Sequence, residues 1–288
     1  MKNWIIYDAK YENTITSISM LEKAKDYGLD SELYFFQYFS YVNIDGKTNL
    51  YYKNKQITKL PDIAFIRGYD YDIHNFLHNN NVKFVNDMEG TLLTRDKFKM
   101  HEYVGKMGIK QPKTITGNNL TYKEICKLLN DKVFVMKDRY GMRGDNVFLI
   151  HNEEEFLNAK SNTNINFIYQ QYIEDSKGHD LRLYIVGEKV FGPIERYSIT
   201  DDFRSNISQG GDAKLFQNLP IEITEKSIKL TQSLGLNFCS IDYLLSKNEF
   251  YFCEANANAA FSVFFNFEID LQSQIMKYIA SLEWNWYI

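Results

Sequence analysis

Three oxygen-bearing side chains in two apolar segments near the end of the chain are suited to binding a metal ion. Asp242 lies in the first segment, and Glu254 and Asn256 lie in the second. Alternate residues of a β-strand share one face, so we expect Glu254 and Asn256 to point to the same side. If residues 247–249 form the loop between the segments, Asp242 lies directly opposite Glu254. The sequence therefore predicts a hairpin on which two carboxylates and an amide converge.

The chemistry of this hairpin favours a divalent cation. Two carboxylates side by side in apolar surroundings repel each other unless a cation compensates. Hard oxygen ligands at this density favour Mg²⁺, with Mn²⁺ as the less favoured ion. The alternative is an edge strand with solvated acids, which the apolar residues on both faces of each segment disfavour.

A second segment, residues 137–146, has the composition of a phosphate-binding loop. It begins at Lys137 and contains Gly141 and Gly144 between two apolar, strand-like runs. Glycines at this spacing allow backbone N–H groups to approach a phosphate, and Lys137 adds a point charge. It is not a P-loop, because no Gly-Lys-Ser/Thr follows. An ordinary hairpin with turn glycines explains the same residues equally well.

A third segment, residues 201–211, is polar and glycine-rich and contains Arg204, Ser205 and Asn206. The planar guanidinium of Arg204 suits a phosphate or a carboxylate. We interpret the segment as a ligand-facing loop. The alternative is a solvated surface loop.

Other kinds of active site have little support. No serine nucleophile elbow, Cys–His signature or HExxH motif is present, so nucleophilic hydrolysis is not expected. The cysteines are expected to be buried thiols in a reducing compartment. The histidines show no metal spacing and are expected at the surface, at positions 74, 78, 101, 151 and 179.

Composition excludes several classes of protein. The 288 residues include 33 Lys+Arg and 37 Asp+Glu, a net charge of −4 that argues against nucleic acid as the main partner. No apolar run approaches the roughly 18–20 residues that span a bilayer. The N-terminus lacks the apolar stretch of a secretory signal. We therefore expect a cytoplasmic protein that binds neither nucleic acid nor membrane.

The elements that must position these segments change character along the chain. Residues 1–90 alternate short apolar runs with helical periodicity, which predicts a small α/β domain with a parallel sheet. After it, hairpin patterns predict α+β sheets in a central subdomain, 91–172, and a C-terminal subdomain, 173–288, that carries the metal site. The fold class is thus α/β plus α+β, with a cleft where ligands tend to bind.

Taken in order, the three segments resemble the ATP-grasp superfamily, and most closely its RimK-type amino-acid (glutamate) ligases. The resemblance covers about residues 85–280. It implies an ATP-grasp fold, in which two α+β subdomains enclose the nucleotide behind the N-terminal parallel-sheet domain. Asn146 stands where the family usually has a third glycine in its loop, and asparagine tolerates a left-handed backbone better than most residues.

The resemblance also implies roles for individual residues. The phosphates of ATP would contact Lys97, Lys137 and the loop glycines 141 and 144. Adenine would meet Gln171 and Tyr172, and the ribose would lie beside Asp180. The remaining implied residues are the Arg204-Ser205-Asn206 block and the ligands of two Mg²⁺ ions, Asp242, Glu254 and Asn256.

The implied activity is ATP-dependent joining of a carboxylate to an amine through an acyl phosphate, with Arg204 and Lys137 as catalytic residues. The product would be a peptide, protein or small carboxylate extended by an amino acid. Two alternatives remain open: a sensor or scaffold that binds ATP without ligating, and a carboxylate kinase that stops at the acyl phosphate. The sequence also allows a homo-oligomer.

Overall fold

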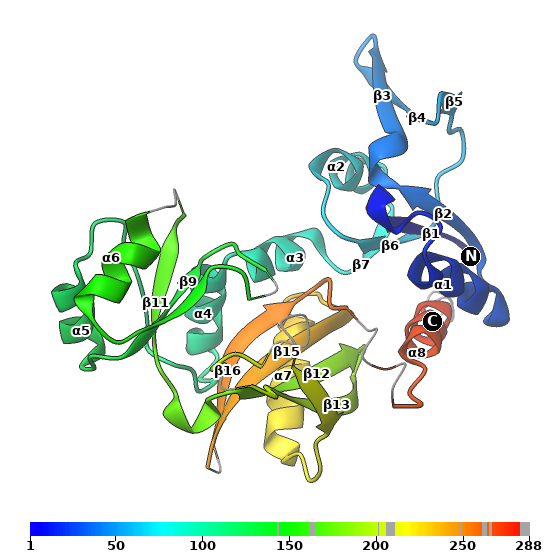
Figure 1. The fold of residues 1–288 in the computed structure, drawn as a ribbon. Coiled ribbons are helices and arrows are strands. Elements are labelled where there is room, and N and C mark those ends of the chain that lie inside the picture. Colours follow the sequence, from blue (N-terminus) through cyan, green and yellow to red (C-terminus); the bar gives the residue numbers. More distant parts are fainter. Residues whose placement is uncertain are drawn as a thin grey trace. The chain divides into compact units, whose positions relative to one another are not determined.

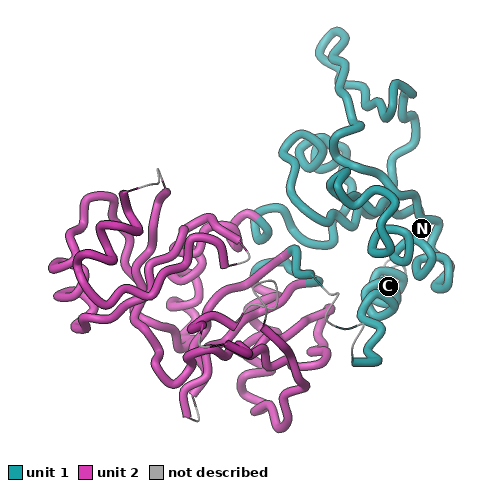
Figure 2. The backbone as a smooth tube through the Cα atoms, viewed as in Figure 1, with its two compact units in different colours: residues 1–91, 234–238, 258–288 teal, residues 92–233, 239–257 magenta. Residues whose placement is uncertain are grey.

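The computed structural model describes residues 1–142, 144–161, 165–200, 202–205, 211–247, 249–260, 264 and 267–282. The chain forms two compact units, shown in Figure 2. Unit 1 contains residues 1–91, 234–238 and 258–288, and unit 2 contains residues 92–233 and 239–257. The end of the chain therefore belongs with the N-terminal residues. The expected three-domain division stays a prediction. In the described parts of the chain, no helix is long and apolar enough to cross a bilayer.

Unit 1 is built on a four-stranded parallel sheet, as its alternating pattern predicted. The strand order is β2-β1-β6-β7, and β1 pairs in parallel with both β2 and β6. The strands are β1 (Lys2–Tyr7), β2 (Asp30–Phe35), β6 (Ile63–Arg67) and β7 (Lys83–Val85). Its helices are α1 (Ile15–Asp26), α2 (Tyr71–Asn79) and α8 (Leu271–Ser281), and helix α3 (Met88–Arg95) begins in this unit and ends in unit 2.

A separate antiparallel sheet, which the sequence analysis did not predict, is inserted between β2 and β6. It contains β3 (Phe39–Ile44), β4 (Lys47–Tyr52) and β5 (Lys55–Gln56), in that order. Asp45 and Gly46 form the turn between β3 and β4 with φ values of +50° and +81°. Asp-Gly is a strong hairpin signal because both positions of this turn need a positive φ. The sequence therefore contained the signal for this hairpin.

The first part of unit 2 is a four-stranded antiparallel sheet, which we call sheet C. Its order is β10-β9-β11-β8, and its inner residues, such as Phe134, form a core with Ile125 and Phe156 of the helices. The strands are β8 (Thr114–Thr116), β9 (Phe134–Asp138), β10 (Val147–Ile150) and β11 (Phe167–Gln171). The helices of this part are α4 (Lys97–Lys106), α5 (Tyr122–Leu129) and α6 (Glu153–Ser161).

The second part of unit 2 is a five-stranded sheet, which we call sheet D, with the order β14-β13-β12-β15-β16. Its strands are β12 (His179–Val186), β13 (Lys189–Tyr197), β14 (Asp212–Leu215), β15 (Phe238–Ser246) and β16 (Glu249–Asn256). Helix α7 (Ile221–Ser233) precedes β15. Figure 1 shows the two sheets of this unit and the segment after β11 that connects them. This mixed architecture agrees with the predicted fold class.

Candidate active site

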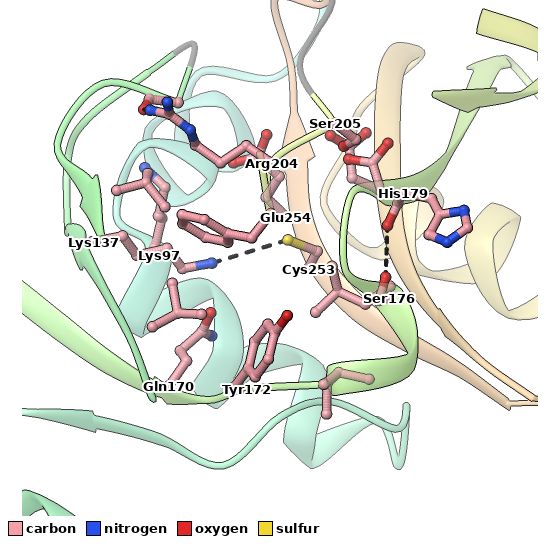
Figure 3. A pocket seen from close by; sticks show the side chains of 18 of the residues that line it. Lys97, Lys137, Gln170, Tyr172, Ser176, His179, Arg204, Ser205, Cys253 and Glu254 are labelled. Carbon is pink, nitrogen blue, oxygen red and sulfur yellow. Dashed lines mark hydrogen bonds between the residues drawn. The ribbon is translucent and has the colours of Figure 1, made fainter. Parts of the chain in front are cut away.

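A pocket in unit 2 collects nearly all of the predicted site residues (Figure 3). It encloses about 900 Å³, including open solvent at its mouth. Both sheets of the unit contribute side chains. Asn256 is not part of the lining, and Asn206 lies outside the described residues. The predicted residues that do line the pocket are Lys97, Lys137, Gly141, Gly144, Gln171, Tyr172, Asp180, Arg204, Ser205, Asp242 and Glu254.

Two lysines form one wall of the pocket, which we call the lysine wall. Lys97 is the first residue of α4, and its Nζ donates to the carbonyl oxygen of Gly141. Lys137 lies near the end of β9, is only 7% exposed, and places its Nζ 3.9 Å from the Sγ of Cys253. Burial lowers the pKa of Lys97, the negative charge of Glu254 opposes this effect, and the positive charge of Lys137 adds to it. This wall therefore presents concentrated positive charge that an anion would relieve.

The loop between β9 and β10 has the backbone that phosphate binding requires. Gly144 and Asn146 have φ values of +79° and +53°. Asparagine thus adopts the left-handed conformation expected of it at the position of the family's third glycine. At Gly141, a Cβ would lie 2.8 Å from the Cβ of Asp138, so only glycine fits without a shift. Nearby, Arg139 anchors the start of the loop.

The anchor of the loop is an ion pair with the residue that caps α4. Arg139 Nε and Nη2 donate to the two carboxylate oxygens of Asp96, each at 2.7 Å. Asp96 is also the N-cap of α4 and accepts from the backbone N–H of Lys99. Because Lys97 begins the same helix, the anchor holds Lys97 and the loop together.

The opposite wall carries the predicted metal ligands on the hairpin of β15 and β16. The expected pairing is confirmed: Asp242 lies opposite Glu254, and Ser240 lies opposite Asn256. The expected loop, residues 247–249, is one residue too long, because Glu249 already pairs with Ser246. A β-bulge between Asp242 and the next residue restores the register.

The structure corrects our argument about the charge of this hairpin. The cations that compensate the Asp242 carboxylate are two arginines of sheet D. Arg182 Nε and Nη2 donate to the two oxygens of Asp242 at 2.7 and 2.6 Å, and Arg196 Nη2 donates at 2.8 Å. Arg196 also makes a bidentate pair with Asp180. We call these four residues, together with Glu254, the ion-pair wall; Glu254 Oε1 lies 3.8 Å from Arg182 Nη2. Charge repulsion alone therefore does not require a metal here.

Burial and ion pairing act in opposite directions on the two buried acids of this wall. Burial would raise the pKa of Asp242, but Arg182 and Arg196 outweigh it and lower that pKa to about 2. Burial raises the pKa of Asp180, and the negative charge of Asp242 adds to this effect while Arg196 opposes it. Asp242 is thus held as an anion in a fixed orientation.

The donor set still fits Mg²⁺. Asp242 and Glu254 supply carboxylate oxygens at the pocket, and the Nδ2 of Asn256 donates to Glu254 Oε1 at 3.1 Å, which leaves its amide oxygen as an acceptor. Mg²⁺ uses one or two carboxylates and takes its other ligands from water and substrate phosphates. Within the described ranges, no three His, Cys, Asp or Glu side chains gather as a metal cluster. The site is therefore suited to an ion that arrives with a nucleotide.

The segment between the sheets supplies the apolar end of the pocket. Gln171 and Tyr172 line it together with four aliphatic side chains, Val135, Val147, Ile173 and Leu244. The adjacent Gln170 is buried and donates from Nε2 to Thr114 Oγ1 at 2.8 Å. Such a surface suits a flat heteroaromatic ring.

Behind this segment lies a histidine that the sequence analysis wrongly expected at the surface. His101 is 3% exposed, and its Nε2 and Nδ1 lie 2.7 Å from the Nε2 of Gln170 and the Oε1 of Gln111. The amide of Gln170 donates, so His101 is neutral and carries its proton on Nδ1. Burial, reinforced by the charge of Lys137, lowers its pKa to about 4. His74 is likewise buried, at 2% exposed.

Arg204 lines the pocket but is engaged by an acid that the sequence analysis did not single out. Its Nη2 donates to Asp202 Oδ2 at 2.7 Å, and its Nη1 reaches the carbonyl oxygen of Gly144 at 3.4 Å. Ser205, beside it, is buried at 6% exposed. The guanidinium therefore connects the Asp202 segment to the glycine loop.

Sequence reasoning missed four residues that shape the site: Arg182, Arg196, Asp202 and Cys253. Arg182 was detectable, because it lies two positions after Asp180 and so shares its strand face. Arg196 lies opposite Asp180 only because a bulge between Arg182 and Tyr184 shifts the register of β12 and β13. Without the bulge, the two-residue turn would pair Asp180 with Glu195. No sequence signal identified that shift.

Comparison with known proteins identifies the family to which these features belong. The model of the RimK-like ATP-grasp domain matches residues 94–279. A probable alpha-L-glutamate ligase of Parasynechococcus marenigrum (strain WH8102) is 29% identical over 181 residues, which cover 62% of this chain and 39% of the relative. The chain thus spans about two-fifths of that relative. A protein of the same name from Xanthomonas euvesicatoria pv. vesicatoria (strain 85-10) is 29% identical over 218 residues, covering 73% of this chain and 74% of the relative.

Solved structures share the fold over nearly the whole chain. The ATP-grasp ligase PsnB, complexed with a phosphomimetic variant of its minimal precursor, Mg and ADP, has a TM-score of 0.73 at 11% identity, covering 98% of each chain. A RiPP-associated ATP-grasp ligase of Chryseobacterium gregarium, in complex with ADP and a leader and core peptide, has a TM-score of 0.70 at 19% identity. That match covers 99% of this chain and 97% of the other.

Proposed function

The chain belongs to the RimK-like ATP-grasp family, and from this premise we propose that it is an ATP-dependent ligase, which joins a carboxylate to an amine through an acyl phosphate. The acceptor carboxylate attacks the γ-phosphorus of ATP, and ADP leaves. The amine then attacks the acyl carbon, and inorganic phosphate leaves as the amide bond forms. Activation by ATP is needed because a carboxylate and an amine do not condense in water unaided.

The observation that supports this proposal is that one pocket has an apolar end and a charged end. Its aliphatic end, between Val135 and Leu244, suits adenine, and its charged end places the lysine wall opposite Glu254 and Asp242. A triphosphate has the negative charge that the lysine wall lacks and the oxygens that a metal held by the carboxylates would share. Phosphoryl transfer depends almost entirely on such positioning and charge stabilisation.

Each predicted residue then has a defined task. Lys97 and Lys137 would neutralise the phosphates, with the backbone around Gly141 and Gly144 close to them. Arg204 would turn from Asp202 to the transferring phosphoryl group and then stabilise the oxyanion of the tetrahedral intermediate. Gln171 and Tyr172 would contact adenine, and Asp180 the ribose. Ser205 and Asn206 would complete the block beside Arg204.

Asp242, Glu254 and Asn256 would hold Mg²⁺, two ions in our proposal, and Mn²⁺ is the ion we expect to substitute. When bound, the metal neutralises phosphate charge and orients the triphosphate. The arginines of the ion-pair wall keep Asp242 deprotonated and oriented for that task. Glu254 is more exposed and accepts a hydrogen bond from Asn256, so it would move toward the nucleotide more readily than Asp242.

We propose a peptide, protein or small carboxylate as the acceptor and an amino acid as the amine. Relatives named glutamate ligases support an amino acid as the amine. Structures of the same fold that contain precursor peptides support a peptide as the acceptor.

The test is ATP turnover that depends on both substrates, with products identified by mass spectrometry after incubation with Mg²⁺, candidate peptides and pooled amino acids. Acceptor labelled with ¹⁸O in its carboxylate should deliver one ¹⁸O to inorganic phosphate, because that oxygen bridges carbon and phosphorus in the acyl phosphate. Glu254→Gln protein is the matched control for contaminating ATPases.

Two other outcomes would overturn the ligase proposal. ADP release that needs the acceptor but not the amine, with hydroxylamine trapping a hydroxamate, would identify a carboxylate kinase. ATP binding by calorimetry without turnover under any substrate pair would identify a sensor or scaffold.

A further inference from the structure

The hairpin sheet of unit 1 is exposed and basic in an otherwise acidic chain. We call residues 39–60 the arm. Figure 1 shows its strands β3 and β4 extending from the parallel sheet of the same unit. The arm holds one acid, Asp45, against four lysines, Lys47, Lys53, Lys55 and Lys59, whereas the whole chain has a net charge of −4. Lys53 pairs with Glu12 at 3.1 Å, and the other three lysines still outnumber Asp45, so the arm attracts negative charge.

Strand β3 is the open edge of this sheet, because the strand order is β3-β4-β5. Ile44 pairs with Lys47 across a two-residue turn, and such flanking residues form a hydrogen-bonded pair. Pairing then alternates along the strand, so the N–H and C=O groups of Tyr41 and Asn43 and the C=O group of Phe39 point away from β4, whereas the Phe39 N–H already donates to the carbonyl oxygen of Phe36. These groups form a ladder that can accept another strand.

The other edge strands in the described parts of the chain are either short or charged. Natural proteins use both features to prevent unwanted strand pairing. β3 has six residues, Phe-Ser-Tyr-Val-Asn-Ile, without a charge, a proline or a bulge. Among the others, β5, β7, β8 and β10 have two to four residues, and β2, β14 and β16 contain acids or a lysine.

The side chains of β3 alternate between a face that packs against the core and a face that is exposed. Phe39 and Tyr41 pack against the core of unit 1 on one face. On the other face, Val42 is 41% exposed and Ile44 is 56% exposed, and Lys47 lies opposite Ile44. An added strand would therefore gain apolar contacts and a lysine without disturbing the core.

We propose that the edge of β3 binds an extended, acidic segment of the peptide substrate as an additional β-strand. Main-chain hydrogen bonds would supply affinity, and the exposed valine, isoleucine and arm lysines would select apolar residues alternating with acids. This inference rests on the proposed function only in taking the partner to be the acceptor peptide. The binding itself needs neither ATP nor catalysis.

The experiment measures binding of a fluorescein-labelled ten-residue peptide of alternating glutamate and valine to the full chain by fluorescence anisotropy, without nucleotide. Asn43→Pro removes an outward N–H and fills the edge, yet keeps the main-chain bonds to β4, because proline is tolerated on an edge strand. The Asn43 side chain also donates to Thr48 Oγ1 and accepts from the Gly46 N–H, and these bonds are changed in both Asn43 variants. We expect Asn43→Pro to weaken binding about tenfold or more, and the control Asn43→Ser, which keeps the N–H, to stay within about twofold.

A charge variant tests the acidic preference independently of the backbone. The double variant Lys47→Glu with Lys55→Glu should weaken binding about fivefold at low salt and less at high salt. A lysine–valine peptide should bind poorly to the unaltered chain. If a thermal melt shows that Asn43→Pro destabilises the arm, the charge variant and a peptide with N-methylated backbone amides test the proposal in its place.

Three outcomes would overturn the proposal: equal affinity of Asn43→Pro and the unaltered chain, equal binding of the acidic and basic peptides, or self-association that Asn43→Pro abolishes in sedimentation. The last would assign the edge to a second copy of the chain. ADP release measured on the same variants with a short acceptor and an amine separates failure of this inference from failure of the ligase proposal, because that reaction does not need the arm.

Discussion

The two charged walls of the pocket differ in how their charges are compensated. In the ion-pair wall, Asp242 and Asp180 are matched by Arg182 and Arg196 within the protein itself. In the lysine wall, no acid lies within ion-pair distance of Lys97 or Lys137 among the described residues. The first wall is complete without a ligand, and the second is completed by one. We therefore expect the ion-pair wall to contribute to stability and the lysine wall to contribute to affinity.

The sharpest comparison lies within the ion-pair wall, between Glu254 and Asp242. Glu254→Gln should lower ADP release about 10²- to 10³-fold while the melting temperature stays unchanged, because Glu254 is partly exposed and only distantly paired. Asp242→Asn should lose activity and also about 3–5 kcal/mol of stability, because it removes the bidentate carboxylate partner of Arg182 and one of the two carboxylate partners of Arg196. Coupled ADP release and urea unfolding check both. Equal stability of the two variants would contradict the proposed division of roles.

Arg196→Met tests whether the ion-pair wall is a structural network. Arg196 joins Asp180 to Asp242, and all three are buried. Its removal should cost about 3–5 kcal/mol in the free energy of unfolding. Arg196→Lys should recover part of this loss, since it keeps the charge but not the bidentate geometry. Unfolding of Arg196→Met at the unaltered urea midpoint would show that the pairs contribute nothing.

The pH dependence of stability tests whether burial and the charge of the lysine wall keep His101 neutral. Its folded-state pKa, about 4, lies below the ordinary value of 6.5, so the unfolded chain binds a proton that the folded chain excludes. The stability of the neutral form is fully present above pH 6.5 and is lost as pH falls toward 4. The loss amounts to about 3 kcal/mol over that window. Urea unfolding from pH 7 to pH 4.5 should show a smaller decline for His101→Gln, and parallel curves would contradict the assignment.

Lys137→Ala tests the lysine wall directly. It should weaken ATP affinity about 10- to 100-fold by removing a charge from the phosphate site. Stability should be unchanged or higher, because a buried cation without an acidic partner is costly. Calorimetry with the exposed Lys132→Ala as a control measures the first effect, and thermal melts measure the second. Unchanged affinity would remove Lys137 from the nucleotide site.

Asn146 gives the smallest expected effect. Asn146→Gly should leave both stability and affinity nearly unchanged, because glycine adopts the same positive φ without cost. Asn146→Ala should cost about 1–2 kcal/mol through left-handed strain in the loop. Thermal melts of the two variants test this, and equal melting temperatures would show that the loop relaxes to another conformation.

Much of the fold was predictable because local patterns report local structure. The alternating runs of residues 1–90 predicted the parallel sheet, and the hairpins of β12–β13 and β15–β16 were visible in their apolar runs. The arm was missed although Asp45-Gly46 signalled it. His101 was misplaced because its burial depends on Gln111 and Gln170, which come from other segments. A single-residue pattern contains no information about such partners.

The sequence by itself determined the chemical inventory of this protein: which side chains supply oxygen, which supply positive charge, and in what order they occur along the chain. It also indicated many of the positions where the backbone turns left-handed, since glycine and asparagine favour that conformation locally. Only the tertiary structure decided which of those groups face each other. Two β-bulges, beside Asp242 and after Arg182, shift the strand registers by one residue and so bring Glu254 and Arg196 to the acids they oppose. A shift of one residue reverses every face of a strand, and its energy comes from packing across the sheet, which no local pattern records.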